Sequence, residues 1–362
     1  MTNHQTSIKD LILRPFLAAT LGVLIGGLFT LLTGNSPGEA FRVLISAGFG
    51  CESSSNCALL TTLQYATPLM LSGLSAAVAF RAGLFSIGQA GQMILGAASA
   101  NWIASRFTIA PWIHPAAALA VAMTFGMAYA LIPAVLKLYF QINEILSTLL
   151  LNYIALYLVG FIPSGFGNWI PESARLSTIA YGTKLNVGFF IAIGIMIIVY
   201  LFLWRTSAGY EIRMSGQNRT FSKAGGIHTN RSIFLAMLVS GALAGIAGGI
   251  EVLGVHYKFV TNFTGLDEFD GVMVALIGIS HPIGIFFSSI LLGGVRLAAM
   301  TGLSIQMGIP RSIGGMMTAV MVITMGADGI YTRIKTMFLC LYELSLNIRN
   351  KIKQRVGDKP TR

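Results

Sequence analysis

The chain has 362 residues, of which 54% are apolar and only 10% are charged, against about a quarter charged in soluble domains. This composition, with a mean hydropathy of +0.73, excludes a soluble globular enzyme, a disordered chain and a nucleic-acid-binding protein, although the formal net charge is +11. It is typical of an all-α polytopic membrane protein, because one membrane-spanning helix needs about 20 mainly apolar residues.

Ten apolar runs along the chain predict about ten transmembrane helices. They lie near residues 16–33, 62–80, 84–104, 112–136, 145–163, 187–204, 233–253, 269–280, 283–301 and 311–328. The eighth run is short and is followed by Pro282, which cannot continue a helix, so we expect one broken or short helix near residues 269–282. The predicted organisation is a cytoplasmic N-terminus at 1–15, a transmembrane domain at 16–328 and a basic tail at 329–362.

The positions of the basic residues predict the topology. Most of the 24 Lys and Arg residues fall in segments that face the cytoplasm if the N-terminus does, above all 205–232 and the basic tail at 329–362. The positive-inside rule therefore places both termini in the cytoplasm. We expect the first apolar run to stay as a helix rather than to be removed as a signal peptide.

Cysteine and histidine spacing gives no metal signature. Cys51 and Cys57 fall in the predicted first outside loop, where an oxidising exterior would allow a disulfide, but the sequence leaves the bridge and the free thiols equally open. Cys340 is expected inside as a free thiol. His256 and His281 are isolated from other ligand-type residues, so we predict no metal and no cofactor bound by this chain.

The third apolar run opens with polar residues that a lipid-facing helix should not carry. Ser86, Gln89 and Gln92 recur every third residue, which predicts that they share one helix face. Gly88 and Gly91 would allow another backbone to approach closely. Two interpretations remain open: a polar lining of a path through the membrane, or interhelical hydrogen bonds that hold the bundle together.

The fifth run carries Glu144, Thr148 and Asn152 at a spacing of four, so they should also share one face. Glu144 lies near the helix start, where a carboxylate suits the positive end of the helix dipole. It is therefore predicted to act at the helix start, with a gate or a partner contact as the alternative. We group Asn152 with the candidate path residues.

A glycine ridge in the seventh run predicts tight helix packing. Gly241, Gly245 and Gly249 recur every four residues, the small-xxx-small pattern that lets two helices cross closely in a membrane. A nucleotide-binding loop is not indicated, because no Lys-Ser or Lys-Thr pair follows the glycines.

Arg296 is the one basic residue well inside a predicted span, so it must pair or reach water. Asp270 and Glu251 are the possible partners. The span interiors otherwise hold almost no acidic residues, which argues against an ion-coupled secondary transporter. They also hold no nucleophile–base or metal constellation, which argues against a membrane-embedded enzyme.

The predicted inside segment at 205–232 mixes basic residues with glycines and with apolar residues that have no bilayer to enter. Ile212, Phe221 and Ile227 are the apolar positions. This pattern favours a short helix that docks into a groove of another protein over a merely solvated basic loop.

Four blocks of sequence, in order, resemble the permease subunits of ATP-binding-cassette (ABC) importers, in the branch for simple sugars, nucleosides and branched-chain amino acids. The blocks are residues 66–92, 143–155, 209–227 and 269–284. The Phe-Arg-Ala-Gly-Leu-Phe motif at 80–85 and the Asn-Glu-Ile motif at 143–145 are most similar to the longer permease of nucleoside uptake systems.

This resemblance implies a transport subunit of the bacterial cytoplasmic membrane, not an enzyme, that imports a nucleoside by alternating access. A simple sugar as solute and an ion-coupled secondary transporter are the alternatives. The implied partners are a second homologous permease or a second copy, a cytoplasmic ABC ATPase that binds ATP and Mg²⁺, an outside substrate-binding protein or lipoprotein, and membrane lipid. The expected path residues are Ser86, Gln89, Gln92 and Asn152. The expected ATPase-coupling residues are Tyr210, Glu211, Arg213, Gly216, Ala224, Gly225 and Ile227.

Overall fold

The computed structural model describes residues 8–31, 34–53, 56–107, 110–161, 168–180, 182–260, 269–310 and 312–326. The longer helices are α1 (Ile8–Thr30), α3 (Ala58–Arg81), α4 (Gln89–Arg106), α5 (His114–Phe140), α6 (Glu144–Gly160), α7 (Gly188–Arg205), α10 (Thr229–Glu251), α12 (Pro282–Leu297) and α13 (Ser312–Gly326). The shorter elements are α2 (Pro37–Phe49), β1 (Cys51–Ser53), β2 (Asn56–Cys57), η2 (Glu172–Ala174), α8 (Ser207–Gln217), α9 (Arg219–Ala224), η3 (Val252–His256), α11 (Asp270–Ile277) and η4 (Ala298–Gln306). The predicted basic tail, with Cys340, lies outside the described residues.

Among the residues that the structure describes, five helices are long and apolar enough to cross a membrane: α3, α5, α7, α10 continued by η3, and α12 continued by η4. Shorter apolar helices span 15–30, 144–160 and 312–323. The predicted helical membrane protein is therefore confirmed, and each predicted span overlaps a helix. The number of ten spans and the cytoplasmic placement of both termini stay predictions.

Helix α2 was not predicted; it occupies part of the predicted first outside loop. Ser36 caps this helix by accepting a hydrogen bond from the Glu39 backbone N–H at 3.2 Å, and Pro37 takes the first helical position. This Ser-Pro-x-Glu sequence is a helix-start signal. The helix has 13 residues, or about 20 Å of helical rise, which is shorter than the roughly 30 Å core of a bilayer. It packs against η4 and α12.

The predicted short helix is confirmed as α11. Its 8 residues rise only about 12 Å, far less than the roughly 30 Å of a bilayer core. The chain then turns through Ile279 and Ser280, both with left-handed backbone (φ 56° and 48°). His281 caps α12 through Nδ1, which accepts from the Ile283 N–H, and Pro282 is its first residue.

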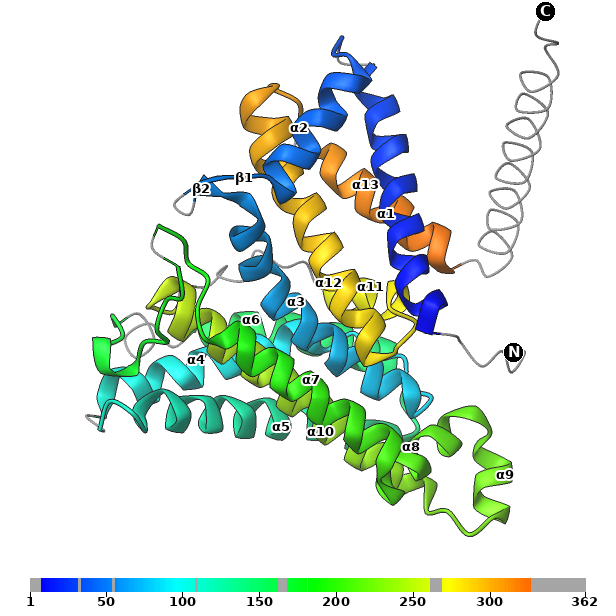
Figure 1. Cartoon of the computed structure of the whole chain (residues 1–362). Helices are drawn as coiled ribbons and strands as arrows, with labels where there is room; N and C mark the ends of the chain where they lie inside the picture. Colours follow the sequence, from blue (N-terminus) through cyan, green and yellow to red (C-terminus); the bar gives the residue numbers. More distant parts are fainter. Residues whose placement is uncertain are drawn as a thin grey trace, which may run out of the picture.

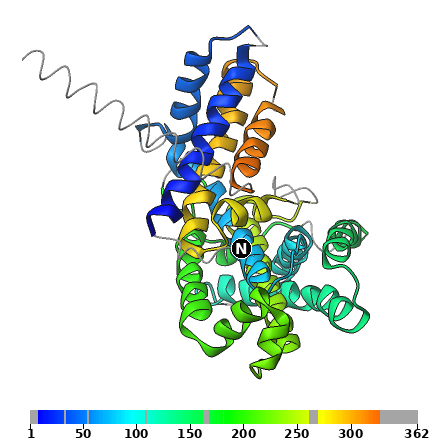
Figure 2. The same ribbon diagram turned by 90° about the vertical axis from the view of Figure 1, so that its right-hand side faces the viewer.

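Helix α3 occupies the centre of the arrangement and contacts α10, α11, α12 and α7. On one side of it, α1, α2, α12 and α13 stand together as an upright group (Figure 1). On the other side α4, α5, α7 and α10 run across the molecule, with α6 packed on α4 (Figures 1 and 2). Residues 66–79 of α3 are buried throughout, as expected of a helix with neighbours on all sides.

The predicted glycine ridge is confirmed as a packing surface. A methyl group on Gly245 would lie 3.1 Å from the Gly126 Cα of α5, and one on Gly248 would lie 2.8 Å from the Met93 carbonyl carbon of α4. Backbones are therefore in direct contact where α10 crosses α4 and α5. In a membrane, such contacts supply dispersion energy that bulkier side chains would prevent.

The structure also decides between the two states of the predicted outside cysteines. Cys51 and Cys57 lie opposite each other in the antiparallel β1–β2 hairpin, and their sulfur atoms are joined as a disulfide. The bridge closes a loop between the end of α2 and the start of α3.

Candidate functional site

A non-helical segment, Gly83–Gly88, links α3 to α4. Helix α3 ends when Gly83, with φ +78°, turns the chain, and the Leu84 N–H bonds back to the Ala79 carbonyl at 3.0 Å. This is a glycine-terminated helix end. Helix α4 begins only at Gln89, so the prediction that Ser86 shares a helix face with Gln89 and Gln92 is wrong: the left-handed turn delays the helix.

The three predicted polar side chains are nonetheless all buried. Ser86 is 0% exposed, and Gln89 and Gln92 are each 1% exposed. The Gln89 Nε2 donates to the Ser86 carbonyl at 3.2 Å. The Oε1 atoms of Gln89 and Gln92 have no hydrogen-bond partner within the part of the chain that the structure describes. Such buried acceptors require an explanation such as water or a ligand.

Helix α6 holds the start of α4 in place. The Asn152 Oδ1 accepts from the Gly91 N–H at 2.9 Å, and its Nδ2 donates to the Ile87 carbonyl at 2.8 Å. The Thr148 Oγ1 accepts from the Ile87 N–H at 3.1 Å. Gly88, the residue before α4, offers no side-chain cap, so α6 supplies the cap that the first turn of a helix needs. Both amide atoms of Asn152 are engaged with backbone.

The predicted close approach of another backbone is confirmed at Gly91, where a methyl group would lie 3.1 Å from the Asn152 Cα, whereas Gly88 approaches a side chain. A methyl group on Gly91 would lie 3.0 Å from the Asn152 Oδ1, and one on Gly88 would lie 3.3 Å from the Thr148 Cβ. Glu144, Thr148 and Asn152 of α6 thus share a face, as predicted. That face contacts the segment Gly83–Gly88 and the start of α4.

Glu144 begins the same face of α6. Its carboxylate pairs with the Lys137 ammonium of α5 at 2.6 Å and lies against the backbone of Phe85. It sits in the first turn of the helix, as predicted, but the hydrogen-bonding cap is Asn143, whose Oδ1 accepts from the Ile145 N–H at 2.9 Å. The Lys137 partner was not predicted, because it lies on the preceding helix.

The Arg296 pairing, which the sequence left open, is made with Asp270. The guanidinium Nη1 contacts the Asp270 Oδ2, and the two side chains are 20% and 5% exposed. Glu251 instead lies 3.6 Å from His256. A buried charge without such a counter-ion would be strongly unfavourable, so this pair fixes the start of α11 against the end of α12.

The predicted docking segment forms two helices, α8 and α9, with different environments. Ile212 is 0% exposed, so its prediction as an apolar residue free to dock is wrong: it packs within this chain, where α8 contacts α7 and α10. Phe221 of α9 is 66% exposed and Tyr210 is 52% exposed. Ala224 and Gly225 are exposed, and Glu211, Arg213 and Ile227 are partly exposed. Gly216 is packed against the α3–α4 turn.

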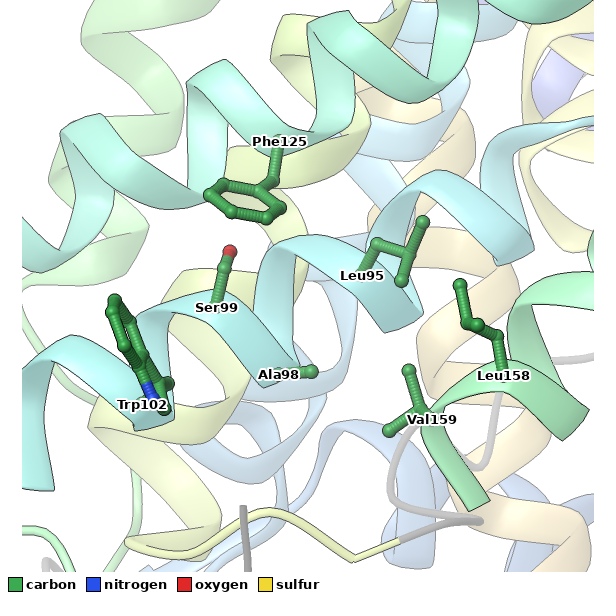
Figure 3. A pocket seen from close by; sticks show the side chains of 7 residues that line it. All are labelled: Leu95, Ala98, Ser99, Trp102, Phe125, Leu158 and Val159. Atoms are coloured by element: carbon green, nitrogen blue, oxygen red, sulfur yellow. The ribbon is translucent and has the colours of Figure 1, made fainter. Parts of the chain in front are cut away.

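A separate apolar cavity of about 260 Å³ lies between α4, α5 and α6. Its lining is Leu95, Ala98, Ser99, Trp102, Phe125, Leu158 and Val159 (Figure 3). The Ser99 hydroxyl donates to the Gly96 carbonyl at 2.9 Å, which leaves the lining essentially apolar. Gln89 and Gln92 do not line it.

Within the described ranges, no group of three or more His, Cys, Asp or Glu side chains lies close enough together to hold a metal ion.

Comparison with known proteins gives consistent matches along the chain. The family model described as "Branched-chain amino acid transport system / permease component" matches residues 58–326. The guanosine ABC transporter permease protein NupP of Bacillus subtilis (strain 168) is 33% identical over 326 residues, covering 86% of this chain and 92% of the relative. The nucleoside ABC transporter permease protein NupB of Lactococcus lactis subsp. cremoris (strain MG1363) is 32% identical, covering 86% and 89%.

A third relative carries a different solute in its name. The glucose ABC transporter permease protein TsgB13 of Haloferax volcanii is 25% identical over 352 residues, covering 89% of this chain and 88% of the relative. All three relatives are named as transport subunits. Similarity to them extends over nearly the whole chain and includes the segment Gly83–Gly88, α6 and α8.

Proposed function

Because the chain belongs to the family of branched-chain amino acid transport system permease components, we propose that it forms half of an ATP-driven importer that carries a nucleoside. It is an integral protein of the cytoplasmic membrane. Transport proceeds by alternating access, in which a path through the helices opens to one side and then to the other. A simple sugar is a weaker candidate, since identity is 33% and 32% to the nucleoside-named relatives and 25% to the glucose-named one.

The observation that carries the proposal is the pair of buried amide oxygens at Gln89 and Gln92. They lie without a hydrogen-bond partner among the described residues, inside a bundle of helices that belongs to a transport family. A neutral side-chain amide can hydrogen-bond the polar groups of a nucleoside without forming an ion pair, and therefore binds it weakly enough for release. We place the path beside Ser86, Gln89 and Gln92, with Asn152 holding the start of α4.

The energy source is a separate ABC ATPase that binds ATP and Mg²⁺, since this chain has no phosphate-binding Gly-x-x-x-x-Gly-Lys-Ser/Thr sequence. The exposed residues of α8 and α9, among them Tyr210 and Phe221, form the proposed contact with it. A second homologous permease, or a second copy of this chain, completes the path, and an outside binding protein or lipoprotein delivers the solute. Ion coupling is disfavoured because Asp270, an acidic residue at membrane depth, is already paired with Arg296.

The test is uptake of radiolabelled guanosine and uridine by cells that express the whole importer and lack other nucleoside carriers. Losing one hydrogen bond costs about 1 kcal/mol, so Gln89→Ala and Gln92→Ala should each raise the half-saturating concentration about fivefold. Gln306→Ala is the matched control, because Gln306 is exposed on η4 and should leave uptake unchanged. Competition by unlabelled glucose at the concentration that unlabelled guanosine needs would reject the nucleoside in favour of a sugar.

A further inference from the structure

The last residue of α3, Arg81, connects separate parts of the structure. Its Nε donates to the Ser280 carbonyl at 3.0 Å, and its Nη2 donates to the Ile279 carbonyl at 3.2 Å. Both acceptors belong to the left-handed turn between α11 and α12. One guanidinium thus fastens the end of α3 to the turn that follows α11.

The same guanidinium lies over the indole ring of Trp204, near the end of α7, at 5.3 Å from the ring centroid. The guanidinium of Arg213, on α8, lies over the same ring at 5.5 Å. The imidazole of His281 is 4.7 Å from that indole. Burial and the charge of Arg81 lower the pKa of His281 to about 4, so the imidazole stays neutral beside the two cations. Trp204 therefore joins α8 to Arg81 through cation–π contacts.

A second contact joins α8 to the residues that follow Arg81. A methyl group on Gly216 would lie 2.7 Å from the Gly83 nitrogen and 2.9 Å from the Ala82 carbonyl carbon. The two backbones therefore touch, and α8 cannot move toward or away from the α3–α4 turn without displacing it or losing the contact. The segment Gly83–Gly88 leads from this turn to Gln89.

We propose that Arg81 is the positioning residue through which a movement of α8 is passed to the segment Gly83–Gly88 and, at the same time, to the α11–α12 turn. This inference rests on the proposed function, which places α8 and α9 at the ATPase. The two helices differ in exposure: α9 presents the exposed Phe221, whereas α8 buries Ile212 and packs Gly216 against the backbone of the α3–α4 turn.

The role requires arginine rather than any cation. A guanidinium is a planar fork that can donate to two carbonyls while its face lies on an aromatic ring, and a lysine ammonium cannot reproduce that geometry. Arg81→Lys keeps the positive charge but removes the planar guanidinium, so it tests whether the two hydrogen bonds and the ring contact must be made together. Trp204→Phe keeps an aromatic face and weakens the cation–π contacts, which gives a second variant should a change at Arg81 impair folding.

The experiment uses the assembled importer, with its ATPase, in lipid vesicles. We expect Arg81→Lys to hydrolyse ATP at close to the wild-type rate but to import about tenfold fewer solute molecules per ATP, a typical size for a coupling contact. Trp204→Phe should lower the same ratio by a smaller factor. Arg205→Lys is the matched control, because Arg205 follows Trp204 in the chain and is exposed; its ratio should equal that of the wild type.

Hydrogen–deuterium exchange separates this role from a merely structural one. In the wild type, trapping the ATPase with ATP and vanadate should change exchange in peptides from α8 and in peptides covering 82–91. In Arg81→Lys the α8 change should remain and the 82–91 change should vanish. A wild-type ratio of import to hydrolysis, or an unchanged response at 82–91, overturns the inference. Absence of ATP-dependent uptake by the wild-type assembly would instead reject the proposed function.

Discussion

Replacing Asn152 by alanine tests whether α6 caps α4, and its cost follows from two hydrogen bonds. The change removes the acceptor of the Gly91 N–H and the donor to the Ile87 carbonyl, at 2.9 and 2.8 Å. Asn152 is only 3% exposed, so water has little access to either group. A buried polar group left without a partner costs about 1–3 kcal/mol, which gives about 2–6 kcal/mol for the pair.

The assay is thermal unfolding of the purified chain in detergent. At about 2–4 °C per kcal/mol, the loss of about 2–6 kcal/mol should lower the midpoint of Asn152→Ala by about 4–24 °C. Amide exchange at Gly91 should also rise, since that N–H loses its partner. Asn143→Ala is the matched control: Asn143 caps its own helix at an exposed position, so its loss should cost about 1 kcal/mol and leave Gly91 unaffected. An unchanged midpoint and unchanged Gly91 exchange in Asn152→Ala would refute the reasoning.

Two further predictions concern the membrane bundle. Gly248→Ala should destabilise the fold by about 1–3 kcal/mol and so lower the unfolding midpoint, since the new methyl group would be forced into the α4 backbone. Gly194→Ala is the control, because open space surrounds Gly194, and it should leave the midpoint unchanged. Equal losses in the two variants would show that the contact at Gly248 is not tight. Asp270→Asn should cost about 3 kcal/mol, the low end for breaking a buried pair, because it removes the carboxylate that pairs with the partly exposed Arg296. The double variant with Arg296→Gln should recover part of that loss, and no recovery would contradict the pairing.

The ten apolar runs predicted most of the helices because lipid imposes the same requirement on every span. Each span must be apolar over many residues, and that signal is local in the sequence. Helix α2 shows the limit: its 13 residues are fewer than the about 20 of a membrane-spanning helix, although Ser36 and Glu39 carry a capping signal. The short α11 was predictable because Pro282 marks the following boundary.

The candidate site was harder to predict from the sequence than the helices, because its contacts join residues far apart in the chain. Spacing alone grouped Glu144, Thr148 and Asn152 on one face, but it could not show that this face binds the Ile87 and Gly91 backbone. The same limit hid Trp204, whose neighbours come from α3, α8 and the α11–α12 turn. The mistaken helical placement of Ser86 has a local cause, since a threefold spacing does not reveal the turn at Gly83.

The central claim is that this chain moves solute only with energy from a separate ATPase, and reconstitution tests it most directly. The permease, the proposed second permease and the proposed binding protein are placed in vesicles with labelled nucleoside and ATP, either with or without the ATPase subunit. We predict accumulation against the gradient only when the ATPase and ATP are both present. Uphill accumulation without the ATPase subunit would contradict the account.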